Sequence, residues 1–226
     1  MSSAPVITID GPGGSGKGTI AMRIADELGW HLLDSGALYR LVAVAALDAG
    51  VEASDETRIA ELARSLDAEF SVAEGEVEIH LAGRNVTARL REHRISERAS
   101  LVAALPGVRA ALVERQRAFR RPPGLVADGR DMGTVIFPDA PLKIYLTASA
   151  EARAERRYKQ LKEKGESVNL PRLFQDIKQR DERDRSRTVA PLRPADDAHV
   201  VDSTEMSIVE VLAEVRKLIE KTSLTS

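Results

Sequence analysis

Short apolar runs alternate with amphipathic helical patterns along most of this chain. Five runs of four to six residues predict strands, and the stretches between them repeat apolar positions with the spacing of a helix. Strands that alternate with helices are typical of a parallel sheet flanked by helices, so we expect an α/β fold. The predicted strands are Val6–Asp10, His31–Asp34, Leu125–Asp128, Leu142–Thr147 and His199–Asp202.

Glycines mark helix ends, and the last helix has a clear apolar stripe. Gly29, Gly50 and Gly165 each follow a helical stretch, at the position where a left-handed glycine commonly ends a helix. The last helix is expected to pack on a face of the sheet, because its apolar residues recur every three or four positions. These residues are Ile208, Val211, Leu212, Val215, Leu218 and Ile219.

Residues 66–90 depart from this alternation of strands and helices. Polar and apolar positions alternate there with a period of two, which predicts short antiparallel strands. We therefore expect a three-stranded meander inserted in the α/β fold. Its predicted strands are Glu69–Val72, Val77–Leu81 and Asn85–Ala88, with turns at Glu74–Gly75 and Gly83.

The stretch Ser96–Arg120 has a helical pattern that is interrupted at Pro106–Gly107. Proline is tolerated in the first turn of a helix but not in its interior. We therefore expect two helices here, the second of which begins at Pro106.

A glycine-rich segment, GPGGSGKGT at residues 11–19, lies between the first strand and an amphipathic helix. Gly11, Gly16 and Lys17 match G-x-x-x-x-G-K, in which backbone N–H groups, a helix N-terminus and a mobile ammonium converge on a polyphosphate. The residue after Lys17 is Gly18, and the hydroxyl expected there comes one position later in Thr19, so direct magnesium ligation by that hydroxyl is in doubt. An ordinary glycine-rich turn is the alternative interpretation.

The sequence also bears on which kind of phosphate-binding protein this is. A GTPase would need an Asn-Lys-x-Asp guanine-binding motif, which is absent. A transport or motor ATPase would carry an aspartate at the end of a second strand; Asp128 fits, but Gly129, Arg130 and Asp131 follow it. An arginine and a carboxylate at the carboxyl end of a strand lie where open α/β sheets bind ligands, which suggests a second substrate. The alternative is a local ion pair on the surface.

A helical pattern from Ser167 onward changes from apolar to charged along one face. Leu170, Leu173, Phe174 and Ile177 begin the stripe, which then continues through charged residues. Buried charges are costly unless they are paired or bound to a ligand, so this face is suited to a cleft. An exposed helix end with i,i+3 and i,i+4 ion pairs is an equally good interpretation. The charged positions are Arg180, Asp181, Asp184 and Arg187.

The preceding stretch, Ser149–Lys164, predicts a strongly basic helix. Two basic helices in sequence would suit a lid over ATP phosphates, since closure excludes water and supplies cations to the phosphoryl group. A solvated basic face is the alternative. The basic residues of this helix are Arg153, Arg156, Arg157, Lys159 and Lys162.

Composition narrows the function further. The 226 residues include no cysteine, which excludes disulfides, thiol catalysis and cysteine-zinc sites, and the four histidines have no metal-site spacing, so we expect no protein-bound metal. No apolar run approaches a membrane span, and no secretory signal is evident, so a cytoplasmic protein is expected.

Residues 151–193 carry 13 Lys and Arg against 8 Asp and Glu, which suggests an anionic ligand. A nucleic-acid-binding module would fit that stretch alone, but a net charge of −2 with 4% aromatic residues argues against it.

Five motifs of this sequence resemble those of the bacterial cytidylate kinase family. The resemblance extends from Pro5 to the last helix, and the motifs around residues 34–40 and 128–134 are specific to that family among nucleoside monophosphate kinases. The motifs are GPGGSGKGT (11–19), LLDSGALYR (32–40), PGVR (106–109), ADGRDMGTVIFPDAPLKIYLTAS (127–149) and RDERDRSR (180–187).

The resemblance implies ATP-dependent phosphorylation of CMP and dCMP, with Mg²⁺ accompanying ATP. It also implies a five-stranded parallel sheet flanked by helices, the P-loop kinase core, with a small antiparallel insertion and a helical lid. The expected core domain comprises residues 1–38, 100–149 and 188–226. The expected acceptor-binding insertion is 39–99, with its meander at 66–90, and the lid with the arginine-bearing helix is 150–187.

Site residues follow from the same resemblance. ATP is expected on Gly11, Pro12, Gly13, Gly14, Ser15, Gly16, Lys17, Gly18 and Thr19, with Arg153 and Arg157 in the lid. The acceptor phosphate is expected on Ser35, Arg40, Arg130 and Arg187, the ribose on Arg180 and Asp184, and cytosine on Ser100, Arg109 and Asp131. Arginine forks suit phosphate oxygens, and a carboxylate accepts from the exocyclic amine of cytosine.

Phosphoryl transfer needs positioning and charge neutralisation more than covalent chemistry, so Lys17, Arg130 and Arg187 are the expected catalytic residues. A P-loop kinase for another small molecule is the alternative enzyme. We expect ATP, CMP and dCMP as partners, no nucleic acid or membrane, and a monomer, since no apolar stripe is left unpaired.

Overall fold

A computed structural model describes residues 4–73, 76–163, 165–222 and 224 of the chain. Its contacts divide it into two compact units. The first comprises Met1–Asp34 and Arg117–Ser226, and the second comprises Ser35–Gln116.

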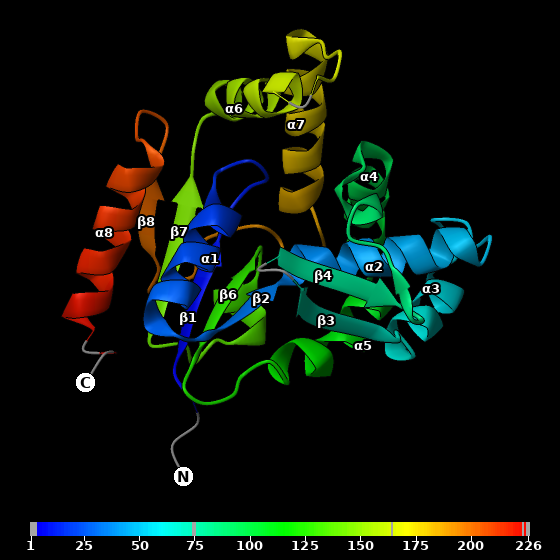
Figure 1. Ribbon diagram of the computed structural model, residues 1–226, viewed down its shortest axis with the longest axis horizontal. Helices are drawn as coiled ribbons and strands as arrows, with labels where there is room; N and C mark the ends of the chain where they lie inside the picture. Colours follow the sequence, from blue (N-terminus) through cyan, green and yellow to red (C-terminus); the bar gives the residue numbers. More distant parts are fainter. Residues whose placement is uncertain (1–3, 74–75, 164, 223, 225–226) are drawn as a thin grey trace. The chain divides into compact units, whose positions relative to one another are not determined.

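The first unit is built on a five-stranded parallel sheet with the strand order β2-β6-β1-β7-β8 (Figure 1). Because all strands run in parallel, their carboxyl ends lie along one edge, where Asp10 is in register with Gly129 and Asp34 with Asp128. The predicted strands are confirmed, with one residue added to the third. The strands are β1 (Val6–Asp10), β2 (His31–Asp34), β6 (Leu125–Gly129), β7 (Leu142–Thr147) and β8 (His199–Asp202).

Two helices, α1 (Lys17–Leu28) and α8 (Ile208–Lys221), pack together in the main core of this unit. The stripe predicted on α8 is buried except for its first residue, Ile208, which is 39% exposed. Ser207 caps this helix reciprocally with Glu210, so its start is defined by polar groups and Ile208 lies outside the packed face. Gly29 adopts the left-handed conformation at the end of α1, as its position predicted.

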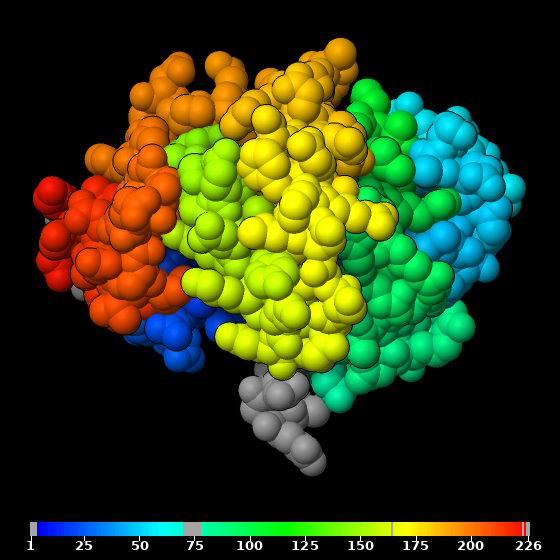
Figure 2. Space-filling model, turned by 90° about the horizontal axis from the view of Figure 1, so that it is seen from above, coloured from blue at the N-terminus to red at the C-terminus, as the bar shows by residue number. Residues whose placement is uncertain are grey.

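A short π-helix, η2 (Met132–Ile136), follows β6 and contacts β1. A Cβ atom on Gly133 would lie only 2.8 Å from Thr8 Oγ1, so glycine permits this close approach. Helices α6 (Ala150–Glu163) and α7 (Leu170–Arg185) pack against each other and lie side by side, yellow-green and gold, in Figure 2. The helix predicted from Ser167 begins only at Leu170, because the Asn169 side chain accepts the Arg172 N–H and caps it there.

The second unit combines helices with a small sheet. Its long helix α2 (Ser35–Asp48) is buried along most of its length and packs against α3 (Glu56–Arg64) and α4 (His93–Val102). The break predicted in the helical stretch is confirmed: α5 (Pro106–Arg117) begins at the proline. The first of the two helices starts earlier than predicted, since the Ser96 N–H already bonds to the Glu92 carbonyl. A 3₁₀ turn, η1 (Arg89–Arg91), precedes it.

The meander is present as three antiparallel strands, β3 (Ala68–Ala73), β4 (Glu76–Leu81) and β5 (Arg84–Asn85). The third strand was predicted at Asn85–Ala88 but spans only two residues. The Val86 N–H still bonds to the Ile79 carbonyl. Side chains then replace the backbone pairing, because Thr87 Oγ1 accepts the Ile79 N–H and Asn85 Oδ1 accepts the Thr87 N–H. Gly83 has the positive φ of the predicted turn, whereas the turn at Glu74–Gly75 lies outside the described residues.

Within the described ranges, no helix is long and apolar enough to cross a bilayer.

Candidate functional site

The glycine-rich loop joins β1 to α1 at the carboxyl edge of the parallel sheet. Gly11, Gly14 and Gly16 have backbone φ values of 152°, 81° and 92°, which residues other than glycine rarely adopt. A Cβ atom on Gly11 would lie 2.0 Å from the Leu146 carbonyl oxygen. The strand, loop and helix that the motif requires are therefore all present.

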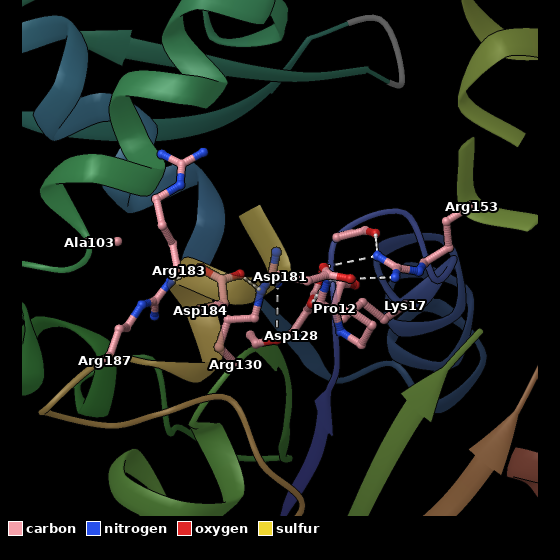
Figure 3. Close-up of polar contacts among 12 residues, drawn as sticks. Pro12, Lys17, Ala103, Asp128, Arg130, Arg153, Asp181, Arg183, Asp184 and Arg187 are labelled. Carbon is pink, nitrogen blue, oxygen red and sulfur yellow. Dashed lines mark hydrogen bonds and ion pairs between the residues drawn. The ribbon is translucent and has the colours of Figure 1, made fainter. Parts of the chain in front are cut away.

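Lys17 is the first residue of α1, and its side chain is buried against the loop (Figure 3). Its Nζ donates to the Pro12 carbonyl at 3.3 Å and lies 3.7 Å from Asp128 Oδ1. Burial, followed by repulsion from Arg130, lowers the pKa of Lys17 to about 8, although Asp128 favours the charged form. A buried ammonium beside backbone N–H groups is well suited to an anionic ligand.

Arg153 and Arg157, the two expected lid arginines, differ in their surroundings on α6. The Arg153 side chain is buried and donates to the Gly13 carbonyl of the loop at 3.0 Å. It also donates to both carboxylate oxygens of Asp181 on α7. Arg157 is half-buried.

Asp10, the last residue of β1, is buried directly before the loop. Its carboxylate accepts the Met132 and Gly133 N–H groups, each at 2.8 Å, and so holds the start of η2 next to Asp131. Burial raises the pKa of Asp10 to about 7, although these two hydrogen bonds favour the ionised form. The backbone next to the predicted base-binding carboxylate is therefore fixed by a second carboxylate.

The raised pKa of Asp10 predicts a specific pH dependence of stability. An acid that binds its proton more tightly when folded contributes stability below its unfolded pKa of about 4, and loses it as pH rises to about 7. This one group contributes a slope of at most about 1.4 kcal/mol per pH unit. Urea unfolding of Asp10→Asn should therefore show a weaker fall in unfolding free energy between these pH values than the parent. Exposed Asp26, replaced in the same way, is the control; an unchanged slope in Asp10→Asn would contradict the assignment.

Three charged side chains meet where α7 faces the carboxyl end of β6. Arg130 Nε donates to Asp184 Oδ2 at 2.9 Å, and Arg187 pairs with the other oxygen of the same carboxylate. Burial opposes the charge on Asp184, but Arg130 and Arg187 outweigh it and lower its pKa. Asp184 likewise raises the pKa of Arg130 against the effect of burial. The Arg130 guanidinium therefore stays charged.

This cluster decides between two pairs of interpretations. Asp181 and Asp184 are 4% and 0% exposed, so the charged face of α7 is buried and is not an exposed helix end. Asp131 is 2% exposed, and Arg130 pairs with α7, so these two residues do not form a local surface ion pair. Arg180 also lies on this face and is half-buried, with its guanidinium carbon 3.7 Å from where a Cβ on Gly13 would be.

The second unit holds the other four predicted acceptor residues. Ser35 begins α2 and Arg40 lies five residues further along it; the first is buried and the second half-buried. Ser100 on α4 is buried, and among the described residues its hydroxyl has no hydrogen-bond partner. Arg109 on α5 is buried, donates to the Ala103 carbonyl at 3.1 Å, and lies 5.6 Å from the centre of the Tyr39 ring.

Comparison with protein families identifies the chain. The model of the family described as cytidylate kinase matches residues 7–221, which include the loop, the Arg130–Asp131 segment and α7. The chain belongs to the cytidylate kinase family. The resemblance of the five sequence motifs is thereby confirmed.

Individual cytidylate kinases are similar over nearly their whole length. The protein named cytidylate kinase from Pseudomonas entomophila is 59% identical over 95% of each chain. The protein of the same name from Aeromonas salmonicida is 58% identical over 94% of this chain and 92% of its own. Among solved structures, an uncharacterized protein from Eubacterium ventriosum shares the fold, with a TM-score of 0.50 at 12% identity over 96% of this chain and 98% of its own.

Three residues that contact the site of this cytidylate kinase family member carry no motif in the sequence. Asp10 ends a predicted strand directly before the loop, and that position was its only signal. Asp181 lies in the charged stripe but received no role, because its partner Arg153 is 28 positions away. Ser203, whose Oγ lies 3.4 Å from the Ser15 carbonyl oxygen of the loop, follows β8 and has no local motif.

Proposed function

We propose that this chain transfers the γ-phosphoryl group of ATP to CMP and dCMP, giving CDP and dCDP. The observation that carries the proposal is the cytidylate kinase family match over residues 7–221 on a chain with an intact strand–loop–helix and a buried Lys17. No protein nucleophile is needed, because phosphoryl transfer depends on alignment and on stabilisation of developing charge.

The donor site in this proposal is the loop at residues 11–19. Backbone N–H groups between Gly11 and Thr19 would bind the β- and γ-phosphates, and the Lys17 ammonium would neutralise charge on the transferring group. The burial of Lys17 supports this role, since a charge acts more strongly where water is excluded. Arg157 on α6 would supply a further cation from the lid.

The acceptor CMP is proposed to bind the residues that the family motifs indicate. Arg130 and Arg187 are half-buried and pair with the two oxygens of one carboxylate, which supports their role as a clamp on the CMP phosphate. Arg180 and Asp184 would contact the ribose. Ser35 and Arg40 would complete the phosphate contacts, and Ser100, Arg109 and Asp131 would bind cytosine.

Magnesium is proposed to enter with ATP. Within the described ranges, no three His, Asp or Glu side chains are grouped as a metal site, and Mg²⁺ is commonly held by substrate phosphates, water and one or two carboxylates. Asp128, buried beside Lys17, fits that requirement, whereas Thr19 is exposed. When bound, the ion would neutralise phosphate charge and orient the phosphates.

We also propose how the chain divides into functional parts. Residues 1–38, 100–149 and 188–226 would form the core, 39–99 the acceptor-binding insertion, and 150–187 the lid. The pairing of α6 with α7 supports treating residues 150–187 as one element. We further propose a cytoplasmic monomer that does not bind nucleic acid.

The activity is tested by measuring ADP formation with CMP, dCMP, UMP, AMP and GMP in separate reactions. We expect turnover to be fastest with CMP and dCMP. Equal or faster turnover with another monophosphate would favour the alternative P-loop kinase. Filter binding to single-stranded RNA, with no kinase activity, would favour the nucleic-acid-binding module.

The proposed contact between Asp131 and cytosine predicts that this residue determines the preference for CMP over UMP. Cytosine presents an amine where uracil presents a carbonyl oxygen, and such a contact discriminates by roughly 1 to 3 kcal/mol. Asp131→Asn, whose amide can donate to uracil, should lower CMP activity and narrow the CMP to UMP ratio in kcat/KM by about tenfold or more. Asp131→Ala should lose CMP activity without a comparable gain in relative UMP use. If both variants keep the parental ratio, Asp131 does not bind the base.

A further inference from the structure

The Arg153 guanidinium connects three segments of the first unit. Its Nε donates to the Ala148 carbonyl after β7, and its Nη1 to the Gly13 carbonyl of the loop, both at 3.0 Å. Both Nη atoms donate to the Asp181 carboxylate on α7, and Figure 3 shows Asp181 facing Arg153. Arg153 and Asp181 are 2% and 4% exposed, so the pair is buried.

The contact with Gly13 determines how the next peptide group points. In a trans peptide plane the C=O and N–H bonds are antiparallel, so fixing the Gly13 carbonyl directs the Gly14 N–H to the opposite side. Arg153 also packs behind the loop, where its Cβ is 3.4 Å from the position of a Cβ on Gly14. The Gly14 N–H is therefore directed away from Arg153.

Such outside support matters because the loop is rich in glycine. Gly13, Gly14 and Gly16 have no side chains to restrict their backbone, and an unsupported loop of this kind would sample many peptide orientations. The Ser203 hydroxyl donates to the Thr147 carbonyl at 3.0 Å and lies 3.4 Å from the Ser15 carbonyl, so the shorter of these two outside contacts to the loop is that of Arg153 with Gly13. A loop whose N–H groups are already oriented binds phosphate without the entropic cost of ordering them.

We propose that Arg153 and Asp181 form a positioning pair that preorganises the phosphate-binding loop. The inference rests on the proposed donor site at residues 11–19. Arg153 acts through the Gly13 carbonyl, and Asp181 acts by holding Arg153. This role differs from the lid arginine expected from the sequence, which would contact ATP itself.

The geometry requires an arginine at position 153. A planar guanidinium can serve two carboxylate oxygens and two carbonyls at once, whereas a lysine ammonium has only three donors that diverge from one atom. Asp181 is required because a buried guanidinium without a counter-charge would be expelled toward water. Arg153→Lys therefore separates positioning from charge: it keeps the charge and loses the fork.

The test uses two probes, ATP and inorganic tripolyphosphate, with Mg²⁺ present and CMP absent. Calorimetry gives the Kd of each probe for the parent, Asp181→Asn and Arg153→Lys, and thermal unfolding gives Tm. We expect the Kd of each variant to rise about tenfold or more, because the lost contacts orient groups that bind phosphate. For a given variant, the Kd of ATP and the Kd of tripolyphosphate should rise by the same factor. Exposed Glu182→Gln, which removes the same charge from the same helix, should bind like the parent.

Each other outcome overturns the inference. Parental Kd values with a lower Tm would show a purely structural ion pair. Weaker binding of ATP but not of tripolyphosphate would show that Arg153 contacts the adenosine part. Parental binding by Arg153→Lys would show that only charge matters. If Asp181→Asn does not fold, Asp181→Glu replaces it, and the same outcomes apply. A parent that binds neither probe would instead overturn the proposed donor site.

Discussion

Replacing Lys17 with alanine is expected to lower kcat by about a hundredfold or more, the loss typical when one preorganised charge-stabilising group is removed from an active site. Lys17 is buried, contacts the loop and lies beside Asp128, and in the proposed donor site it would neutralise the charge that develops on the transferring phosphoryl group. Its interaction strengthens as charge builds in the transition state, which is why kcat falls. CMP affinity should change little.

Steady-state kinetics of ADP formation, together with CMP titration calorimetry, measures both quantities for Lys17→Ala. Arg23→Ala removes an exposed cation from the same helix and is the control, for which we expect parental values. A Lys17→Ala protein with nearly parental kcat would be incompatible with the proposed donor site.

Asp184→Ala is expected to lower the unfolding free energy by about 3 to 5 kcal/mol, the usual cost of breaking a buried ion pair by removing one partner. The carboxylate is fully buried and balances both Arg130 and Arg187. Without it, two half-buried guanidiniums of like charge remain. An anion bound between them would restore part of the balance, so sulfate should stabilise this variant more than the parent.

Urea unfolding at pH 7, in about 50 mM sulfate and in chloride of the same ionic strength, measures both effects. This ionic strength is roughly the physiological one, so charge screening is the same in both solutions. Glu182→Ala, an exposed carboxylate on the same helix, is the control and should cost little. A loss no larger than that of Glu182→Ala, or equal stabilisation of parent and variant by sulfate, would show that Asp184 does not balance the two arginines.

Local signals in the sequence predicted most of the fold. Alternating strands and helices predicted the five-stranded sheet, and Gly11, Gly16 and Lys17 predicted the loop, because strand, glycine turn and helix N-terminus are consecutive in the chain. The third strand of the meander was less predictable. The Thr87 hydroxyl replaces the backbone pairing there by bonding to a strand eight positions away, which a period-two pattern does not record.

The charged residues show where prediction from sequence ended. The stripe on α7 was visible from its spacing, but an exposed helix end and a cleft remained equally good interpretations. The structure decided between them through partners 28 and 54 positions away, Arg153 for Asp181 and Arg130 for Asp184. Asp10 likewise owes its role to the Met132 and Gly133 N–H groups, more than 120 positions away.

By itself, then, the sequence determined the family, the strand–loop–helix and the residue types that suit phosphate, because short-range periodicity and motifs encode them. Only the tertiary structure decided which buried charges balance one another and which carbonyls of the loop are held from outside. The physical reason is that burial and ion pairing depend on groups brought together by the parallel sheet, whose strands pair out of chain order. The pairing of buried charges in the first unit therefore depends on its topology, although the sequence specifies each charged residue.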